Sequence, residues 1–121
     1  MNGNSQNANT GLAELGREHN YVVVQPSANG GSWGRSDYRK VHDFLLQNKT
    51  AWNIDANRIH FTGFSQGSIM TWEFVCKYPE LIASAAPIAY QFRSSCFGSG
   101  KSNPQIPIFY HTGVKLSLIH I

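Results

Sequence analysis

The segment Gly63-Phe64-Ser65-Gln66-Gly67 joins a predicted strand to a predicted helix. The residues before it, 58–62, read as a strand, and the residues from Gln66 to Tyr78 carry apolar side chains around most of a helix. Pro79 ends that helix, because proline cannot continue it. A G-x-S-x-G segment at a strand-to-helix junction predicts a sharp, strained turn that exposes its serine hydroxyl at the end of a sheet.

This turn predicts a nucleophilic serine. We expect Ser65 to present its hydroxyl, and the backbone N–H of Gln66 to lie at the helix N-terminus, where negative charge develops on an attacked carbonyl. We also expect glycine to be required at positions 63 and 67, because side chains there would clash with the neighbouring strand and helix. The competing interpretation is an ordinary turn serine with no chemical role.

Strands and helices alternate along the rest of the chain. Two helices are predicted: a short one from Leu12 that closes near His19-Asn20, and a second over Asp37–Asn48 with Asp37 as N-cap. The further predicted strands are Tyr21–Val24, Ser84–Ala89 and Ile106–Tyr110. Such alternation implies right-handed crossovers and a mostly parallel sheet with flanking helices, which is the α/β class. Ligands of these sheets bind at the carboxyl ends of the strands, where Ser65 lies.

Composition excludes several classes of function. The chain has 121 residues and 41% hydrophobic residues, which suits one globular domain. Its net charge of +3 comes from basic residues spread along the chain, so nucleic acid is not a predicted partner. The most apolar segment, Leu81–Tyr90, is too short for a bilayer and is interrupted by Pro87. No spacing of His, Cys, Asp or Glu suggests a metal site, and no cofactor is predicted.

The two cysteines leave their state open. Cys76 falls in the predicted helix after Ser65, and Cys96 in a loop rich in serine and glycine. A disulfide would need an oxidising compartment, whereas a buried helical cysteine needs no partner.

A phosphate-binding loop is a second interpretation of one segment. Gly98-Ser99-Gly100-Lys101-Ser102 resembles the end of a Walker motif, but the motif needs glycine where the chain has Ser95. Asn103-Pro104 follows at once and opposes the helix that the lysine should open. We therefore expect a surface loop here.

Four segments together resemble α/β-hydrolase esterases of the polyhydroxybutyrate depolymerase and feruloyl/acetylxylan esterase group. They are Glu14–Pro26, Gly30–Trp33, Asn53–Ile59 and Tyr78–Ile88, around the Ser65 turn. The resemblance extends from Asn2 to Lys115 and implies a fragment of the α/β-hydrolase fold.

The resemblance also implies further site residues. In that group a His-Gly loop supplies a second oxyanion donor; here Asn2 stands in place of the histidine, and the Asn4 backbone N–H would join that of Gln66. Trp33, in the loop that resembles the substrate-side loop, could stack on a sugar or an aromatic acyl group, or simply anchor its own loop.

The far end of the chain departs from the family. Residues 106–113 resemble the strand after which the family places its acidic triad residue, with the histidine later still. Residues 116–121, Leu-Ser-Leu-Ile-His-Ile, match one reading frame of the transposase mosaic-end adapter used in sequencing libraries. We therefore expect residues 1–115 to be a partial catalytic domain and residues 116–121 to be a non-native tail, with both triad partners missing.

The chain offers no good substitute for those partners. Glu73 and Glu80 are the only carboxylates between Ser65 and His111, and they lie in or just after the predicted helix, away from the turn. His111 resembles a residue that precedes the acid, and His60 is predicted to be structural. None of the five histidines is assigned to catalysis.

The resemblance implies a serine hydrolase of carboxylic esters. Its substrates would be polyhydroxyalkanoates or acylated polysaccharides, and its location extracellular. The N-terminal residues 1–7 are polar and lack the apolar core of a signal peptide, so either the protein is cytosolic or its true N-terminus is missing. The isolated chain would be nearly inactive, because a serine without its base is a weak nucleophile. The alternatives are a thioesterase or serine peptidase of the same fold, and a non-catalytic carbohydrate-binding relative.

Overall fold

The computed structural model describes residues 8–28, 30, 32–97 and 105–113. The chain divides into two compact units, residues 1–41 and residues 42–121. Within the described residues, no helix is long and apolar enough to cross a membrane.

The first unit contains helix α2 (Leu12–Glu18), close to the predicted position. Asn20 ends it in the left-handed conformation, with φ 59°, and the Tyr21 N–H donates to the Gly16 carbonyl at 2.7 Å. This is the arrangement of a Schellman C-cap, in which asparagine replaces the usual glycine. The chain therefore reverses beside α2, and a Cβ on Gly16 would lie 2.3 Å from the Val23 side chain.

The predicted strand at Tyr21–Val24 is wrong: the described structure assigns no strand there. The side chains of these four residues are between 36% and 57% exposed. An apolar β-branched run forms a strand only beside a partner strand, and the local pattern carries no information about that partner. The structure therefore gives this segment an extended course after α2 without a ladder.

Helix α3 (Arg35–Ala51) begins two residues before the predicted start. The Gly34 carbonyl accepts hydrogen bonds from the N–H groups of Asp37 and Tyr38, which makes Gly34 the N-cap. The buried Asp37 carboxylate reaches back to the Gly34 N–H at 2.9 Å. Asp37 thus acts at the third helical position, as the acidic residue of a capping box does, and not as the predicted N-cap.

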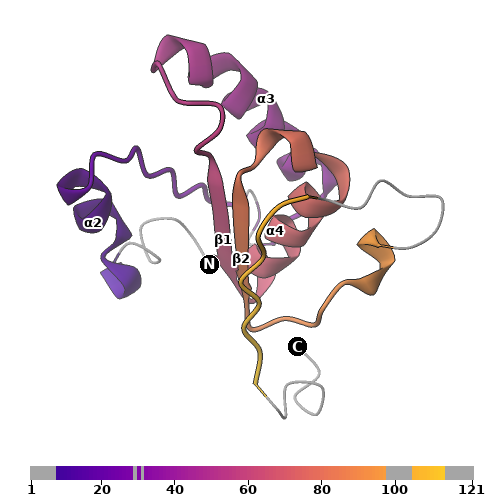
Figure 1. Ribbon diagram of the computed structural model, residues 1–121. Helices are drawn as coiled ribbons and strands as arrows, with labels where there is room; N and C mark the ends of the chain where they lie inside the picture. Colours follow the sequence, from indigo (N-terminus) through magenta and orange to yellow (C-terminus); the bar gives the residue numbers. More distant parts are fainter. Residues whose placement is uncertain (1–7, 29, 31, 98–104, 114–121) are drawn as a thin grey trace. The chain divides into compact units, whose positions relative to one another are not determined.

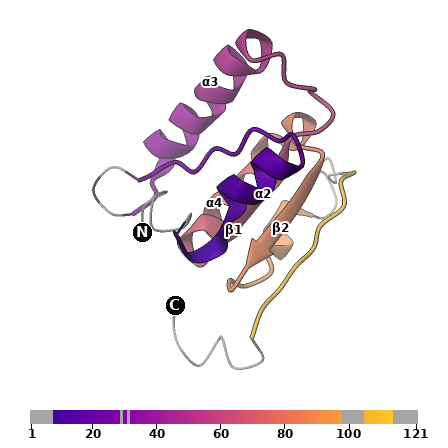
Figure 2. The same cartoon turned by 90° about the vertical axis from the view of Figure 1, so that its left-hand side faces the viewer.

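The second unit is built on two parallel strands, β1 (His60–Phe64) and β2 (Ser84–Ile88). Helix α4 (Gln66–Lys77) connects them and packs on one face, where the rings of Phe61 and Phe74 stack with centroids 4.4 Å apart (Figures 1 and 2). This is the β-α-β unit that the sequence predicts, with β1 two residues later than expected.

The core of this unit lies between α4 and the sheet. Trp72, Phe74 and Val75 of α4 have no exposed surface, and Ala85 of β2 is 1% exposed. Two short 3-10 helices, η1 (Pro79–Leu81) and η2 (Ser94–Cys96), follow α4 and β2 respectively. Because α4 is buried along most of one side, its position relative to β1 is tightly determined.

A third extended segment runs beside β2, on the side away from β1 (Figures 1 and 2). Parallel bridges join Ala85 to Ile108 and Ile88 to His111, so the predicted strand at 106–110 is present only as isolated bridges.

Pro87 explains the interruption. In this register the residue at position 87 would donate to the Phe109 carbonyl, but proline has no N–H. The bonds on either side of that gap are present: Phe109 donates to Ala85, and His111 donates to the Pro87 carbonyl at 3.1 Å. The segment is therefore the third strand of the sheet in position, with one ladder bond removed by Pro87.

Candidate active site

Ser65 occupies a strained turn between β1 and α4. Its backbone angles are φ 55° and ψ −110°, a conformation that residues other than glycine rarely adopt. Strain of this kind costs about 1–3 kcal/mol and persists where the surrounding structure imposes it. Hydrogen bonds impose it here: the Ser65 N–H donates to the Ile88 carbonyl at 2.9 Å, and the Ser65 carbonyl accepts from Ser68 at 3.0 Å.

The side chain of Ser65 is not used to cap the helix. Ser65 occupies the N-cap position, where a serine hydroxyl normally accepts a backbone hydrogen bond, yet it makes no such bond. The residue is half-buried. Its hydroxyl is therefore available for chemistry instead of being engaged in local structure.

The two flanking glycines differ. A Cβ on Gly63 would lie 2.1 Å from the Gly67 carbonyl oxygen and 2.2 Å from the Gly67 carbonyl carbon, so no side chain fits at position 63. A Cβ on Gly67 would meet nothing within 4 Å. The expected steric requirement therefore holds at Gly63 and is wrong at Gly67, because the close approach is to the backbone of Gly67 and not to its missing side chain.

The N-terminus of α4 supplies positive potential beside Ser65. In the described part of the chain, the backbone N–H groups of Gln66 and Gly67 donate no hydrogen bond. The first turn of α4 carries no acidic side chain that would neutralise its dipole. An anion that forms at the Ser65 hydroxyl would meet free backbone donors there.

Three extended segments end around this turn. Phe64, Ile88 and His111 occupy the same level of the sheet, because Phe64 pairs with Ile88 and Ile88 with His111. The Ala89 N–H donates to the His111 carbonyl at 2.8 Å. Ser65 therefore lies at the carboxyl edge of the sheet, where parallel α/β sheets bind ligands.

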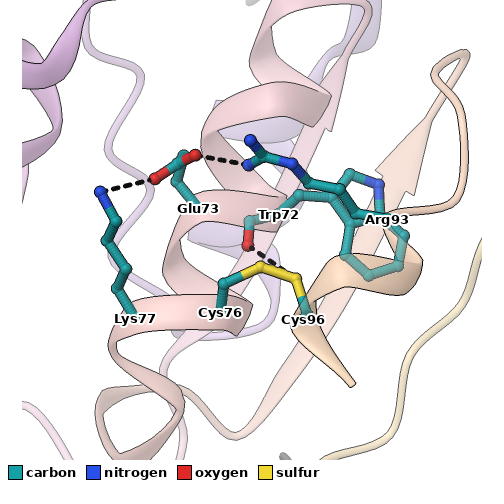
Figure 3. The surroundings of a disulfide bond; sticks show 6 residues. All are labelled: Trp72, Glu73, Cys76, Lys77, Arg93 and Cys96. Atoms are coloured by element: carbon teal, nitrogen blue, oxygen red, sulfur yellow. Dashed lines mark hydrogen bonds and ion pairs between the residues drawn. A yellow bond between two sulfur atoms is a disulfide. The ribbon is translucent and has the colours of Figure 1, made fainter. Parts of the chain in front are cut away.

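Glu73, one of two carboxylates weighed as a triad acid, has other partners. It forms ion pairs with Arg93 and, at 3.0 Å, with Lys77 (Figure 3). Burial opposes ionisation of Glu73, but the hydrogen bonds and charges of these two cations outweigh it and hold its pKa below the ordinary value of 4.5. Glu73 is thus engaged in fixing residues 89–97 to α4.

The cysteines, left open by the sequence, form a disulfide. Cys76 of α4 bonds to Cys96 of η2 across a separation of 20 residues (Figure 3). Cys96 is buried, with 6% of its surface exposed. The bond ties the loop after β2 to the helix that begins at the candidate nucleophile.

The other predicted site residues are distributed as follows. Asn4 lies outside the described residues. Trp33 is half-buried in the first unit, and its stacking beside the nucleophile stays a prediction. His60 lies at the amino end of β1, opposite to the Ser65 end, where its Nδ1 shares a hydrogen bond with the Ser84 hydroxyl at 2.7 Å. Across the described residues, no group of three His, Cys, Asp or Glu could hold a metal ion.

Sequence reasoning missed the loop after β2. Its attachment to α4 depends on Arg93 and Cys96, which lie 20 residues after their partners Glu73 and Cys76. The even number of cysteines is the one signal that could have suggested it. Charge pairing at this separation follows no local pattern.

The comparisons with known proteins agree with the family resemblance. The chain is 31% identical over 117 residues to the bifunctional acetylxylan esterase/xylanase XynS20E of Neocallimastix patriciarum, covering 93% of this chain and 17% of that protein. It is 30% identical over 95 residues to poly(3-hydroxyalkanoate) depolymerase C of Paucimonas lemoignei, covering 66% of this chain and 23% of that protein. Acetylxylan esterase A of Aspergillus ficuum is 28% identical over 105 residues, covering 76% of this chain and 34% of the esterase. No protein-family profile matches the chain.

A solved structure shares the fold. The acetyl xylan esterase from Aspergillus awamori superposes with a TM-score of 0.68 at 19% identity, covering 84% of this chain and 42% of the esterase. The predicted fold class, a fragment of an α/β-hydrolase fold with parallel strands and flanking helices, is confirmed. The chain spans about a third or less of the length of the curated relatives named above.

Proposed function

We propose, on the premise that this chain is related to the acetylxylan esterases and a polyhydroxyalkanoate depolymerase, that it is the nucleophile segment of a serine hydrolase of carboxylic esters. The observation that carries the proposal is the conformation of Ser65, strained at a strand-to-helix turn with its hydroxyl not engaged in capping. A strained serine in this position is the nucleophile of hydrolases that use a G-x-S-x-G turn.

The proposed chemistry is acyl transfer in two steps. The Ser65 hydroxyl attacks the ester carbonyl while a histidine base takes its proton, and the alcohol leaves as the acyl-enzyme forms. The Gln66 N–H, with the Asn4 N–H as its proposed partner, stabilises the negative oxygen of each tetrahedral intermediate. Water then attacks the acyl-enzyme, which releases the acid and restores Ser65.

The family resemblance implies that the acid and the histidine of the triad follow His111 in the chain, and we propose this order for the full-length protein. The ion pairs of Glu73 favour this assignment, because they leave its carboxylate no free role as the triad acid.

Acetyl groups on a xylan-type polysaccharide are the proposed substrate. Relatives at 31% and 28% identity are named for acetylxylan, against one at 30% named for polyhydroxyalkanoate, which remains the second candidate. The disulfide between Cys76 and Cys96 supports an extracellular location, because such bonds persist in oxidising compartments.

The Ser65→Ala change tests the proposal in the full-length protein that carries this chain. Hydrolysis of 4-nitrophenyl acetate should fall by at least roughly a thousandfold, because a serine hydrolase loses its nucleophile. A fluorophosphonate probe should label the wild type and not the Ser65→Ala variant. Retained hydrolysis would exclude the serine mechanism, and a wild type that takes no label would favour the carbohydrate-binding alternative.

A further inference from the structure

The peptide unit between Ile88 and Ala89, at the end of β2, is bonded to a different segment on each side. Its carbonyl oxygen, on Ile88, accepts the hydrogen bond of the Ser65 N–H at 2.9 Å. Its N–H, on Ala89, donates to the His111 carbonyl at 2.8 Å. In a trans peptide these two groups point in opposite directions. One rigid plane therefore connects the Ser65 turn, on one side of β2, with the third extended segment on the other.

The two residues joined by this peptide unit share an unusual backbone conformation. Among the described residues, those with a side chain and a positive φ are Asn20, Asn53, Ser65 and Ala89. Asparagine adopts this region readily, because its short polar side chain bonds to the local backbone. Ser65, at φ 55°, and Ala89, at φ 59°, have no such explanation, and these conformations persist only where the surrounding structure imposes them. A rotation of the shared peptide unit would release both hydrogen bonds together.

The rest of the loop after β2 favours the conformation of Ala89. An ion pair and a disulfide attach residues 93–96 to α4, the helix that begins directly after Ser65 (Figure 3). The chain therefore leaves the line of β2 at Ala89, where the positive φ changes its direction. Ala89 is thus held from both sides, by the ladder bond to His111 and by the attached loop.

We propose that Ala89 is a positioning residue for the reaction at Ser65, a role that rests on the proposed function of the Ser65 turn. The left-handed conformation of Ala89 orients the peptide unit that holds the Ser65 backbone in its strained form. The same unit fixes the third extended segment, beyond which the family resemblance implies the acid and the histidine. Ala89 acts on the nucleophile through backbone hydrogen bonds and not through its side chain.

The test compares one substitution at two alanines of the full-length protein. Ala89→Val places a β-branched side chain at a positive φ, whereas Ala86→Val, the matched control, places it in the extended backbone of β2. Both alanines are half-buried, so the added volume is matched.

The expected loss is in reactivity and not in substrate binding, because the displaced group is the nucleophile. For Ala89→Val, kcat for 4-nitrophenyl acetate and the rate of fluorophosphonate labelling should fall at least roughly tenfold, with KM within about threefold of the wild type. Ala86→Val should keep all three constants within about threefold. Unchanged labelling of Ala89→Val, or an equal loss in Ala86→Val, would overturn the inference.

A residue that accepts a positive φ should preserve the activity. Glycine adopts this region without steric cost. Ala89→Gly should therefore keep kcat and the labelling rate within about twofold of the wild type, with a melting temperature that is equal or higher. An Ala89→Gly protein as impaired as Ala89→Val would assign the effect to the missing methyl group and refute a role of the backbone conformation.

Hydrogen exchange of the wild type keeps the inference testable if Ala89→Val does not fold. The amide protons of Ser65 and Ala89 should each exchange at least roughly a hundredfold more slowly than in an unstructured peptide, and with protection factors within about tenfold of each other. Rapid exchange at either amide would contradict the connection through one peptide unit. Because exchange does not depend on catalysis, unprotected amides in a protein whose Ser65 is labelled would refute this inference and leave the proposed function standing.

Discussion

Replacing Gly63 by alanine is the most direct test of the turn around Ser65. The new Cβ would lie 2.1 Å from the Gly67 carbonyl oxygen, where ordinary contact begins at 3.4 Å. The atoms that the Cβ would meet belong to the backbone of Gly67 in α4, which cannot move aside as the end of a flexible side chain can. β1 and the first turn of α4 must therefore separate by roughly 1 Å. A displacement of this size at a reacting centre can lower the rate by about a hundredfold.

The same displacement should lower stability. Overpacking a well-packed interior typically costs about 1–3 kcal/mol, and we expect the upper end of that range because the backbone cannot change rotamer. Gly67→Ala is the matched control: its Cβ meets nothing within 4 Å, and glycine in a helix costs up to about 1 kcal/mol relative to alanine. Gly67→Ala should therefore be neutral or stabilising.

The assay uses both variants in the full-length protein. Thermal and urea unfolding measure the free energy of unfolding, and hydrolysis of 4-nitrophenyl acetate with fluorophosphonate labelling measures the reactivity of Ser65. We expect Gly63→Ala to lose about 3 kcal/mol of unfolding free energy and at least roughly tenfold in labelling rate. We expect Gly67→Ala to be at least as stable as the wild type, with a labelling rate within about threefold of it. A Gly63→Ala protein as stable and reactive as the wild type, or a Gly67→Ala protein that is the more damaged of the two, would refute the turn geometry.

Two further predictions concern the loop after β2. Replacing Cys76 and Cys96 together by alanine should lower the free energy of unfolding by about 3 kcal/mol, because the disulfide closes a loop with a 20-residue separation. Chemical denaturation of the wild type and the variant under oxidising conditions measures this difference. Equal stabilities would contradict the prediction. The pKa of Glu73 is lowered in the folded protein, so its ionised carboxylate stabilises the fold above the unfolded pKa of about 4.5, and this contribution is lost as the pH falls through the folded pKa. The free energies of unfolding of the wild type and Glu73→Gln should therefore differ most at neutral pH and converge in acid. A stability difference that does not depend on pH would exclude the ion pairs as its source.

The sequence by itself determined the features that depend on residues close together in the chain. The position of α4 follows from its apolar pattern and from Pro79, and the turn at Ser65 follows from the glycine two residues before it. Helices are predictable in this way because their hydrogen bonds close within four residues. The sharp backbone conformation at Ser65 likewise results from a strand that runs directly into a helix.

Only the tertiary structure decided the features that depend on distant residues. The apolar run at residues 21–24 has the composition of a strand and forms none, whereas residues 107–111 run along β2 with a gap that Pro87 creates. The pairing of Cys76 with Cys96 and the charge partners of Glu73 join segments 20 residues apart. Strand pairing, cross-links and ion pairs all depend on which segments meet in space, and no local pattern of side chains specifies that meeting.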